Sequence, residues 1–405
     1  MSKHHYEELG VCSRKAKRKR PHLYFVMNDG DGYSIRKVDL SSDYDSDDDA
    51  IHHKDGTIYA RELPLPRVLI RFHDSFSGEF FTAIGTKILA TGIGSPRRAA
   101  PAFDVLSRTL SLGPRPQMRP CSPLYMPVGC SLVSLDFGST QLLDSPPPEN
   151  ISCQWSWQEL PKAPFKHLDV TCHAEHPDGH TLFVSTLSGG SPSTFTLDTV
   201  NGVWKQHSNW ALPFKGHVHF DPALDAWVGF PEAKEHLGYL CSSNVVTIDA
   251  VAIPDFNVVS IPAPDTGCKV QPMDSDDGES SDDDSSGDLT PRLMLGKDKI
   301  FCEDPAEQHH CAALVYMGGR SKYCLLQCFS VIDQNGMDND DEDDPYQVEV
   351  KDEDLPRRHM LRLTTFTLKY DMDRELSTAK RRRVRCYELP PDVEQLFGCI
   401  QAFWI

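Results

Sequence analysis

The stretch STFTLDTVNGVWKQH, residues 193–207, joins an alternating Phe-x-Leu run to a polar turn and a second alternating run. A similar phrase, TTFTLKYDMDREL, occupies residues 364–376. Alternation with a period of two places successive side chains on opposite faces of a strand, and turn residues between two such runs predict a β-hairpin. The repetition indicates that the chain builds this hairpin more than once.

The same order of strand, polar turn and strand recurs along most of the chain. Residues 23–27 and 33–40 flank the turn NDGDG, residues 80–94 contain two short strands, and FGCIQAFWI at 397–405 is typical of a final strand. These segments group into about six units of roughly 40–50 residues, the period range of β-propeller blades. With 30 Pro and 26 Gly in 405 residues, long helices are hard to place.

We therefore predict an all-β fold, a β-propeller of about six blades. Four-stranded sheets stacked radially cover one another's faces, so each blade has to repeat the same core-packing phrase. The final strand is expected to join the first sheet and close the ring, because closure removes exposed edges. A two-layer β-sandwich is the alternative, since it also has short strands with a turn roughly every 8–12 residues.

The formal charge of −18 is concentrated in three acidic runs: DYDSDDD (43–49), DSDDGESSDDD (274–284) and DNDDEDD (338–344). Like charges repel and keep such segments extended, so we predict disordered acidic inserts at 41–55, 270–290 and 333–356 of a propeller that spans 21–405. Loops of this charge repel phosphate, which argues against nucleic acid as a partner. The first two runs do not fit a calcium-binding EF-hand loop, because neither has its Gly at position six.

Residues 1–20 are polar and basic, and we expect a disordered tail. Its segment RKAKRKR (14–20) is a candidate nuclear-import signal, although a solubilising leader is the plainer interpretation. The cationic residues of this segment are Arg14, Lys15, Lys17, Arg18, Lys19 and Arg20. A second basic run, KRRRVR (380–385), is interpreted as the solvated face of a strand.

The N-terminus lacks the apolar stretch of a secretory signal. No uncharged apolar run reaches the ~18 residues that a membrane-spanning helix needs. The 13 Cys contain no CxxC and are interpreted as reduced thiols. These features predict a cytoplasmic or nuclear protein, or one found in both places, without a membrane partner and expected to be a monomer.

Three serines in the acidic runs have an acid three residues downstream. They are Ser46, Ser280 and Ser281, followed by Asp49, Asp283 and Asp284. An acid-directed kinase of the casein kinase 2 type could phosphorylate them and add charge to loops that are already charged. We treat the three serines as candidate phosphorylation sites.

No sequence motif of a known catalytic class occurs, whether Walker loop, G-x-G-x-x-G, H-E-x-x-H or G-x-S-x-G. We predict no catalytic residue, no cofactor and no metal site. His217 and His219 are two residues apart on an expected strand and would share a face, which two metal-binding imidazoles require. We interpret them as hydrogen-bonded or solvated residues. The tryptophans at the ends of repeating hairpins are interpreted mainly as core between blades: Trp155, Trp157, Trp204, Trp210, Trp227 and Trp404.

Several phrases together resemble a plant family of unknown function that is greatly expanded in grasses. They are KAKRKRPHLYFVMNDGDGYSIRKVDL (15–40), FTAIGTKILA (81–90), PAFDVLSRTLSLGPRP (101–116), HPDGHTLFVST (176–186), STFTLDTVNGVW (193–204), HFDPALDAWVGF (219–230) and TTFTLKYD (364–371). That family looks like kelch-type β-propellers, although Gly-Gly doublets occur here only at 189–190 and 318–319. Plant propellers of this kind often follow an F-box, and the 20 residues before the first blade are too few for one.

The function expected from these observations is that of a non-enzymatic protein–protein interaction module with an unidentified protein partner. A propeller presents loops from a rigid scaffold, and such loops commonly bind partners. Two alternatives stay open. One is a substrate adapter of a ubiquitin ligase that lacks its own F-box, and the other is a metal-assisted enzyme of the kelch type.

Overall fold

The computed structural model describes residues 21–28, 32–40, 50–52, 58–60, 62–73, 79–92, 100–117, 120–147, 155–248, 290–302, 304–332, 357–379, 382–390 and 400–405. The regular elements of this part of the chain are strands, apart from two short 3-10 turns, η2 (His167–Asp169) and η3 (Lys234–His236). Among the described residues, no helix has the length and apolar character needed to cross a bilayer. The fold is all-β, as the alternating sequence predicts.

Three sheets of four strands make up the first part of the ring, and we call them blades 1 to 3. Blade 1 has the order β28-β1-β2-β6, blade 2 the order β10-β9-β8-β7 and blade 3 the order β11-β12-β13-β14. Their strands are β1 (Leu23–Asn28), β2 (Tyr33–Val38), β6 (Val68–Phe72), β28 (Gln401–Trp404), β7 (Glu79–Ile84), β8 (Lys87–Gly92), β9 (Ala100–Asp104), β10 (Thr109–Gly113), β11 (Leu124–Val128), β12 (Ser131–Asp136), β13 (Ser139–Leu143) and β14 (Gln158–Leu160).

Blades 4 and 5 are joined into one eight-stranded sheet by a parallel pair, β15 and β19, which are the first strands of the two blades. Blade 6 contains β23, β24, β25 and β27 in antiparallel order, with β26 paired to β25. These strands are β15 (Val170–Glu175), β16 (Thr181–Ser188), β17 (Ser191–Asp198), β18 (Val203–Ser208), β19 (Phe214–Asp221), β20 (Ala226–Pro231), β21 (Cys241–Asn244), β22 (Leu293–Leu295), β23 (Glu307–Gly318), β24 (Lys322–Ile332), β25 (Arg357–Tyr370), β26 (Leu376–Thr378) and β27 (Arg383–Glu388).

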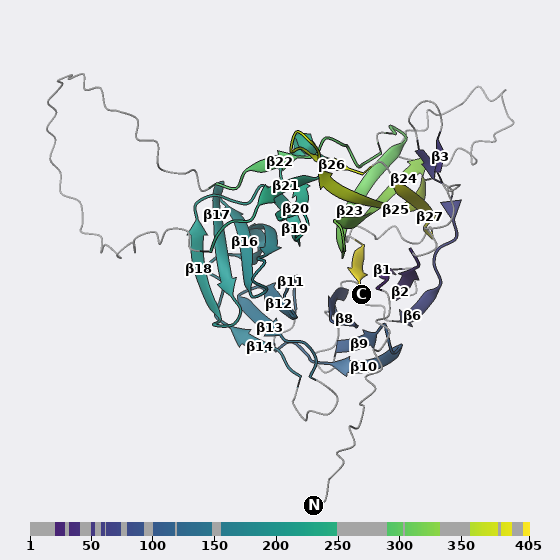
Figure 1. Ribbon diagram of the computed structural model, residues 1–405. Helices are drawn as coiled ribbons and strands as arrows, with labels where there is room; N and C mark the ends of the chain where they lie inside the picture. The colour runs from purple at the N-terminus through teal and green to yellow at the C-terminus, as the bar shows by residue number, and fades with distance from the viewer. Residues whose placement is uncertain are drawn as a thin grey trace, which may run out of the picture.

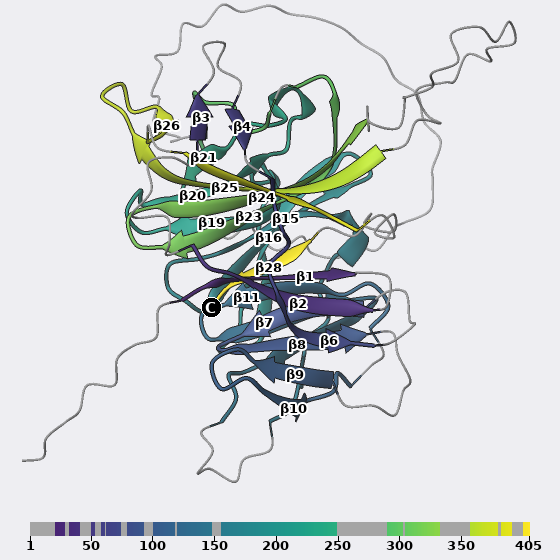
Figure 2. The ribbon, with the colours of Figure 1, turned by 90° about the vertical axis from the view of Figure 1, so that its right-hand side faces the viewer.

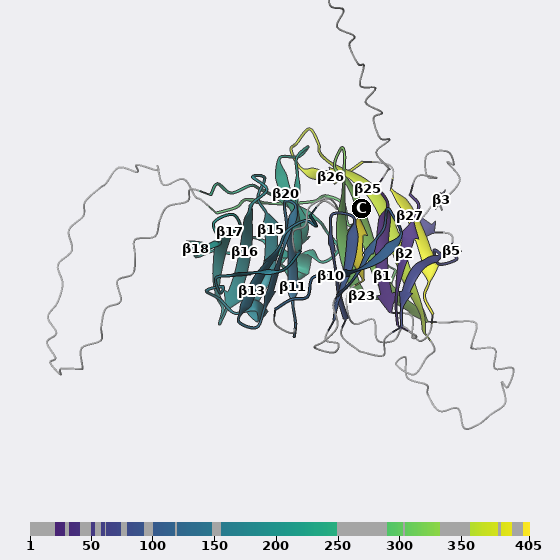
Figure 3. The same ribbon diagram turned by 90° about the horizontal axis from the view of Figure 1, so that it is seen from below.

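The blades follow one another around a ring in chain order, which makes the molecule a β-propeller (Figure 1). Seen from its edge, the ring shows β1, β2 and β6 side by side (Figure 2). From below, blade 4 lies across the ring from the sheet of β1 and β2 (Figure 3). These blades contain all the described strands except β3, β4 and β5, and the number of about six blades for the whole chain stays a prediction.

The ring is closed at one seam, between blade 6 and blade 1, by two separate strand pairings. β28 pairs with β1 along the inner edge, with Leu23 opposite Trp404, as the sequence predicts. On the outer side, β5 (Glu62–Leu63), which lies between β2 and β6 in sequence, adds in parallel to β27 of blade 6. Segments from near both ends of the described chain therefore hold the seam.

The repeated phrases occupy equivalent places in their blades. STFTLDTVNGVWKQH forms the β17–β18 hairpin, TTFTLKYDMDREL the β25–β26 hairpin, and the related APAFDVLSRTL the β9–β10 hairpin. Each begins on the third strand of a blade. The turn chemistry is also shared, because an Asp at the end of the strand or directly after it accepts two backbone N–H groups through its Oδ1: Asp104, Asp198 and Asp371.

A residue with positive φ closes each of these turns. It is Arg108 (59°), Gly202 (64°) or Arg374 (60°). Only glycine adopts this conformation without strain, so two of the three turns place a bulky residue where glycine would be relaxed. The repeated phrase thus specifies an Asp-capped turn as well as a strand.

The core lies between neighbouring blades. A typical cluster joins blades 3 and 4 and includes Met126, Leu135, Leu182 and Leu197. The tryptophans predicted as inter-blade core are found there: Trp157 and Trp227 are buried, and Trp155, Trp204, Trp210 and Trp404 pack against these clusters. The two-stranded sheet of β3 (Ala50–His52) and β4 (Ile58–Ala60) overlaps the first predicted insert, 41–55.

Candidate binding site

The residues singled out for modification and targeting lie outside the described residues. This holds for the import segment (Arg14, Lys15, Lys17, Arg18, Lys19 and Arg20) and for the serines Ser46, Ser280 and Ser281. The three acidic runs, 43–49, 274–284 and 338–344, also lie outside them. The candidate sites that the structure does place are a histidine cluster, an acidic turn and two pockets.

The histidine cluster forms where blades 4 and 5 join. His173 on β15 lies directly opposite His217 on β19, and their rings stack at 4.9 Å between centroids with planes 11° apart. His219 follows on β19, with its ring centroid 4.3 Å from that of His217. The Nε2 of His219 is 2.8 Å from the carbonyl oxygen of Leu314 on β23, so the cluster reaches blade 6.

These three imidazoles differ in their access to solvent. His217 is exposed, although the surrounding protein partly desolvates its ring, and His219 is partly buried. His173 is buried, and its Nε2 has no hydrogen-bond partner. Burial lowers the pKa of all three below the ordinary value, that of His173 to about 3, and the neighbouring imidazoles add to the effect for His173 and His217.

The geometry of this cluster suits packing better than metal coordination. Stacked rings face each other with their π surfaces, whereas a shared ion requires the nitrogen lone pairs to converge on one point. One grouping of three metal-type ligands occurs among the described residues, formed by Asp371, Asp373 and Glu375. The Lys297 Nζ already lies 2.6 Å from Asp371 and 2.5 Å from Glu375, so this acidic turn holds an ion pair.

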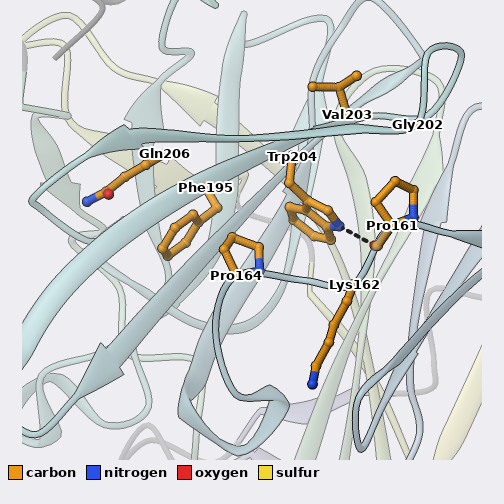
Figure 4. Close-up of a pocket in the computed structure, with 8 residues that line it drawn as sticks. All are labelled: Pro161, Lys162, Pro164, Phe195, Gly202, Val203, Trp204 and Gln206. Carbon is orange, nitrogen blue, oxygen red and sulfur yellow. Dashed lines mark hydrogen bonds between the residues drawn. The ribbon is translucent and has the colours of Figure 1, made fainter. Parts of the chain in front are cut away.

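The better candidate for binding is an open pocket of about 420 Å³ where blades 3 and 4 meet (Figure 4). Its aromatic side chains are Phe195 on β17 and Trp204 on β18. The opposite wall is the segment PKAPF (161–165), which connects β14 to η2. The pocket is lined by Pro161, Lys162, Pro164, Phe195, Gly202, Val203, Trp204 and Gln206.

Strand alternation explains how the aromatic side of the pocket arises. In the β17–β18 hairpin, Phe195 lies opposite Gln206 and Leu197 lies opposite Trp204. Residues directly opposite each other in an antiparallel pair share a face, so these four side chains all face blade 3. Leu197 fills the inter-blade core, while Phe195, Trp204 and Gln206 line the opening.

The proline segment is held against these rings by a hydrogen bond and by ring contacts. The Trp204 Nε1 donates to the Pro161 carbonyl oxygen at 3.1 Å. Phe165 packs edge-on against Trp204 at 5.2 Å and lies 4.8 Å from Phe195. In Figure 4 the ring of Pro164 lies between Phe195 and Trp204, and Pro161 lies beyond the indole.

The pocket has a single ionic side chain, Lys162, which is exposed and forms no ion pair with any described residue. Exposed apolar side chains lie close by. Phe137 (54% exposed) stacks edge-on against His167 at 4.1 Å, and the neighbouring Leu168 is 68% exposed. The surface around the pocket therefore combines uncovered apolar area with one unpaired positive charge.

A second pocket, of about 530 Å³, lies along the outer closure of the ring between β5 and β27. Its carboxylates, Glu62 and Glu388, are both bound by the Arg358 guanidinium, at 2.8 and 2.9 Å. The guanidinium neutralises the two carboxylates that could attract a cationic ligand, so we interpret this ion-pair cluster as part of the ring closure.

Sequence reasoning did not find the pocket between blades 3 and 4. Trp204 was assigned to the core, which is correct for one edge of its indole, and the prolines at 161 and 164 were not singled out. The available signal was the P-x-x-P spacing of PKAP before a repeated hairpin that contains two aromatic residues. That spacing is typical of segments that dock on aromatic rings.

Comparison with known proteins adds a family assignment. No curated protein matches the chain. TolB from Acinetobacter baumannii has a similar structure with a TM-score of 0.37 and 11% identity, over 91% of this chain and 67% of that chain. A chain of a nidogen–laminin complex has a TM-score of 0.34 and 12% identity, over 55% of this chain and 74% of that chain. A family model described as "Protein of unknown function (DUF1668)" matches residues 20–387. The chain therefore belongs to the DUF1668 family.

Proposed function

We propose that this protein is a non-enzymatic protein–protein interaction module, and that the pocket between blades 3 and 4 binds an extended, proline-containing segment of a partner protein. The observation that carries the proposal is the docking of the chain's own Pro161–Pro164 stretch on Trp204 and Phe195, beside which these two residues line an open pocket. The surface already accepts the chemistry that a second such segment would present.

The physical basis is the low entropic cost of binding a proline-containing chain. Such a segment is held in the polyproline II conformation before it binds, and aromatic grooves take up its ridges while an indole N–H donates to a backbone carbonyl. In this pocket the Trp204 N–H is used internally. A partner segment would therefore gain ring contacts and the carboxamide of Gln206, which is exposed at the pocket.

Charge sets the expected sequence of the partner near this pocket. An acidic residue beside the prolines would pair with Lys162, which has no ionic partner among the described residues. Elsewhere on the molecule the acidic runs favour basic partner surfaces, because opposite charges steer association. The expected complex thus combines a proline-and-acid segment at the pocket with basic area farther away.

Two finer assignments from the sequence remain proposals. A kelch-type propeller is supported by Gly189 and Gly190, which close the turn after the second strand of blade 4 with φ of 57° and 88°. An adapter role in a ubiquitin ligase would use the pocket to hold a substrate. Co-purification of ligase scaffold subunits with the protein, lost on substitution at the pocket, is the measurement that tests this role.

Binding is tested with a fluorescein-labelled synthetic peptide that carries two prolines three residues apart, flanked by glutamates. Fluorescence anisotropy with the full chain should show saturable binding, and Lys162→Glu should weaken it at least tenfold, since repulsion replaces attraction in a partly desolvated site. Lys205→Glu is the matched control, because it makes the same charge change on the opposite face of β18.

Equal affinity of the Lys162→Glu and Lys205→Glu proteins would contradict the assignment of the site. A peptide in which both prolines are replaced by alanine separates proline readout from charge alone. If that peptide binds as tightly as the parent, the pocket reads charge and the proposed partner chemistry is wrong.

A further inference from the structure

Two cysteines face each other in the β23–β24 hairpin of blade 6. Cys311 on β23 lies directly opposite Cys328 on β24 in the antiparallel register. Side chains of directly opposed residues point to the same face of a sheet. Accordingly, both thiols belong to the apolar cluster between blades 6 and 1, in which Cys328 is buried (4% exposed) and Cys311 is partly buried.

Their placement satisfies the geometric requirement for a disulfide. Opposed residues of an antiparallel pair have Cα atoms about 4.5 or 5.5 Å apart, depending on the type of pair. Disulfides span Cα separations of roughly 4.4–6.8 Å, so either case lies within reach without a shift of the backbone. In the structure both residues carry reduced thiols.

We propose that Cys311 and Cys328 form a redox-sensitive dithiol that is converted to a cross-strand disulfide by a small-molecule disulfide such as oxidised glutathione. The thiolate of Cys311, the more accessible of the two, attacks one glutathione sulfur, forms a mixed disulfide and releases one glutathione thiolate. The thiolate of Cys328 then attacks the Cys311 Sγ and expels the second glutathione. The two protein thiols lose two protons and two electrons, and the electrons reduce oxidised glutathione to two thiols.

A third cysteine in the same strand shows what the pair adds. Cys324 is buried in the same cluster as Cys328, but Val315 and Thr365 lie opposite it on the neighbouring strands. It therefore has no thiol directly opposite, although its environment and strand are the same. Cys324 is the natural control for any effect of Cys328.

The proposed bond would tie the first two strands of blade 6 together beside the seam of the ring. The same cluster contains Leu23, Phe25 and Met27 of β1. Oxidation would thus act on the blade to which β5 is added at the seam, and reduction by glutathione or thioredoxin would restore the dithiol.

Peptide mapping of the full chain tests the proposal. The reduced protein is treated with oxidised glutathione, alkylated and digested with trypsin, then analysed by mass spectrometry without reduction. Trypsin cuts after Arg320 and Lys322, so residues 311 and 328 fall on separate peptides that only a disulfide can join. Because Cys302 and Cys324 share those two peptides, the linked species should persist in Cys302→Ser and Cys324→Ser and be lost in Cys311→Ser and in Cys328→Ser.

The exposed thiols of Cys121 and Cys130 provide the internal control, since their glutathionylation shows that the oxidant has acted. Glutathionylated Cys121 and Cys130 without a linked 311–328 species would overturn the proposal. So would a linked species that survives in the Cys311→Ser protein. A stable mixed disulfide on Cys311 that Cys328 does not resolve would overturn it as well, and circular dichroism confirms that each variant is folded.

Discussion

Replacing His173 by phenylalanine is expected to make the protein lose less stability when the pH is lowered. The native state holds this imidazole in a buried site, 5% exposed, with no hydrogen bond to its Nε2 and with the ring of His217 stacked on it. A protonated ring there would be desolvated and close to other imidazoles. Phenylalanine keeps a flat ring in the stack and cannot take up a proton.

The size of the effect follows from the two protonation equilibria. Burial lowers the pKa of His173 from 6.5 to about 3 in the folded protein, so the unfolded chain binds the proton first. The stabilisation is complete above the unfolded value and is lost as the pH falls from there toward the folded value. Between pH 7 and pH 5, the protonation of this single group in the unfolded chain lowers the free energy of unfolding by about 2 kcal/mol, at roughly 1.36 kcal/mol per pKa unit.

Urea unfolding followed by tryptophan fluorescence at pH 7 and at pH 5 measures the effect. The free energy of unfolding should fall by about 2 kcal/mol less in His173→Phe than in the wild type, because carboxylates and the other histidines contribute equally to both proteins. His236→Phe is the control, since His236 lies in η3, which buries no residue. If His173→Phe loses as much stability as the wild type, the imidazole is not held neutral by burial and the reasoning fails.

Three further substitutions test the closure, the buried polar contacts and the repeated turn. Trp404→Ala should lower the free energy of unfolding by about 2 kcal/mol, since the Trp404 indole packs at the seam. Met372→Ala is the control and should change the free energy of unfolding by less than about 0.5 kcal/mol, because Met372 is fully exposed. Urea unfolding measures both variants. Asp221→Ala should cost about 3 kcal/mol of stability, because it leaves the buried donors Ser321 Oγ and Tyr323 OH without their acceptor. Tyr323→Phe removes only one donor and should cost about 1 kcal/mol. Thermal unfolding measures both, and a larger loss in Tyr323→Phe than in Asp221→Ala would contradict the reasoning. Asp198→Ala should cost about 1 kcal/mol through loss of the turn's acceptor. The pKa of this carboxyl is lowered in the folded state, so the difference from wild type in urea unfolding should shrink as the pH falls below 3.8 toward that lower value.

The hairpins could be predicted because their signals are local. In residues 193–207 the alternation sets the strands and the polar stretch after Asp198 sets the turn, so β17 and β18 follow from the sequence alone. The joining of β28 to β1 was predicted from the general disadvantage of open edges and is confirmed. Both predictions need only nearest-neighbour physics or a general rule on edges.

The contacts that build the candidate sites could not be predicted, since they depend on how separate blades are placed. The Trp204 indole reaches a carbonyl 43 residues earlier in the chain. His173 meets His217 only because β15 and β19 pair in parallel, which local turns do not encode. The pairing of Cys311 with Cys328 depends on a register that shifts twice within one hairpin.

The double seam between blades 6 and 1 has a consequence for the synthesis of the protein. The inner edge of β1 finds its partner only when residues 401–404 have left the ribosome, and β5 waits for residues 386 and 387. Until then the first blade exposes backbone donors and acceptors that another chain could pair with. The nascent protein is therefore most in need of chaperone protection at its earliest strands, and translation pauses near the 3′ end of the message would prolong that exposure.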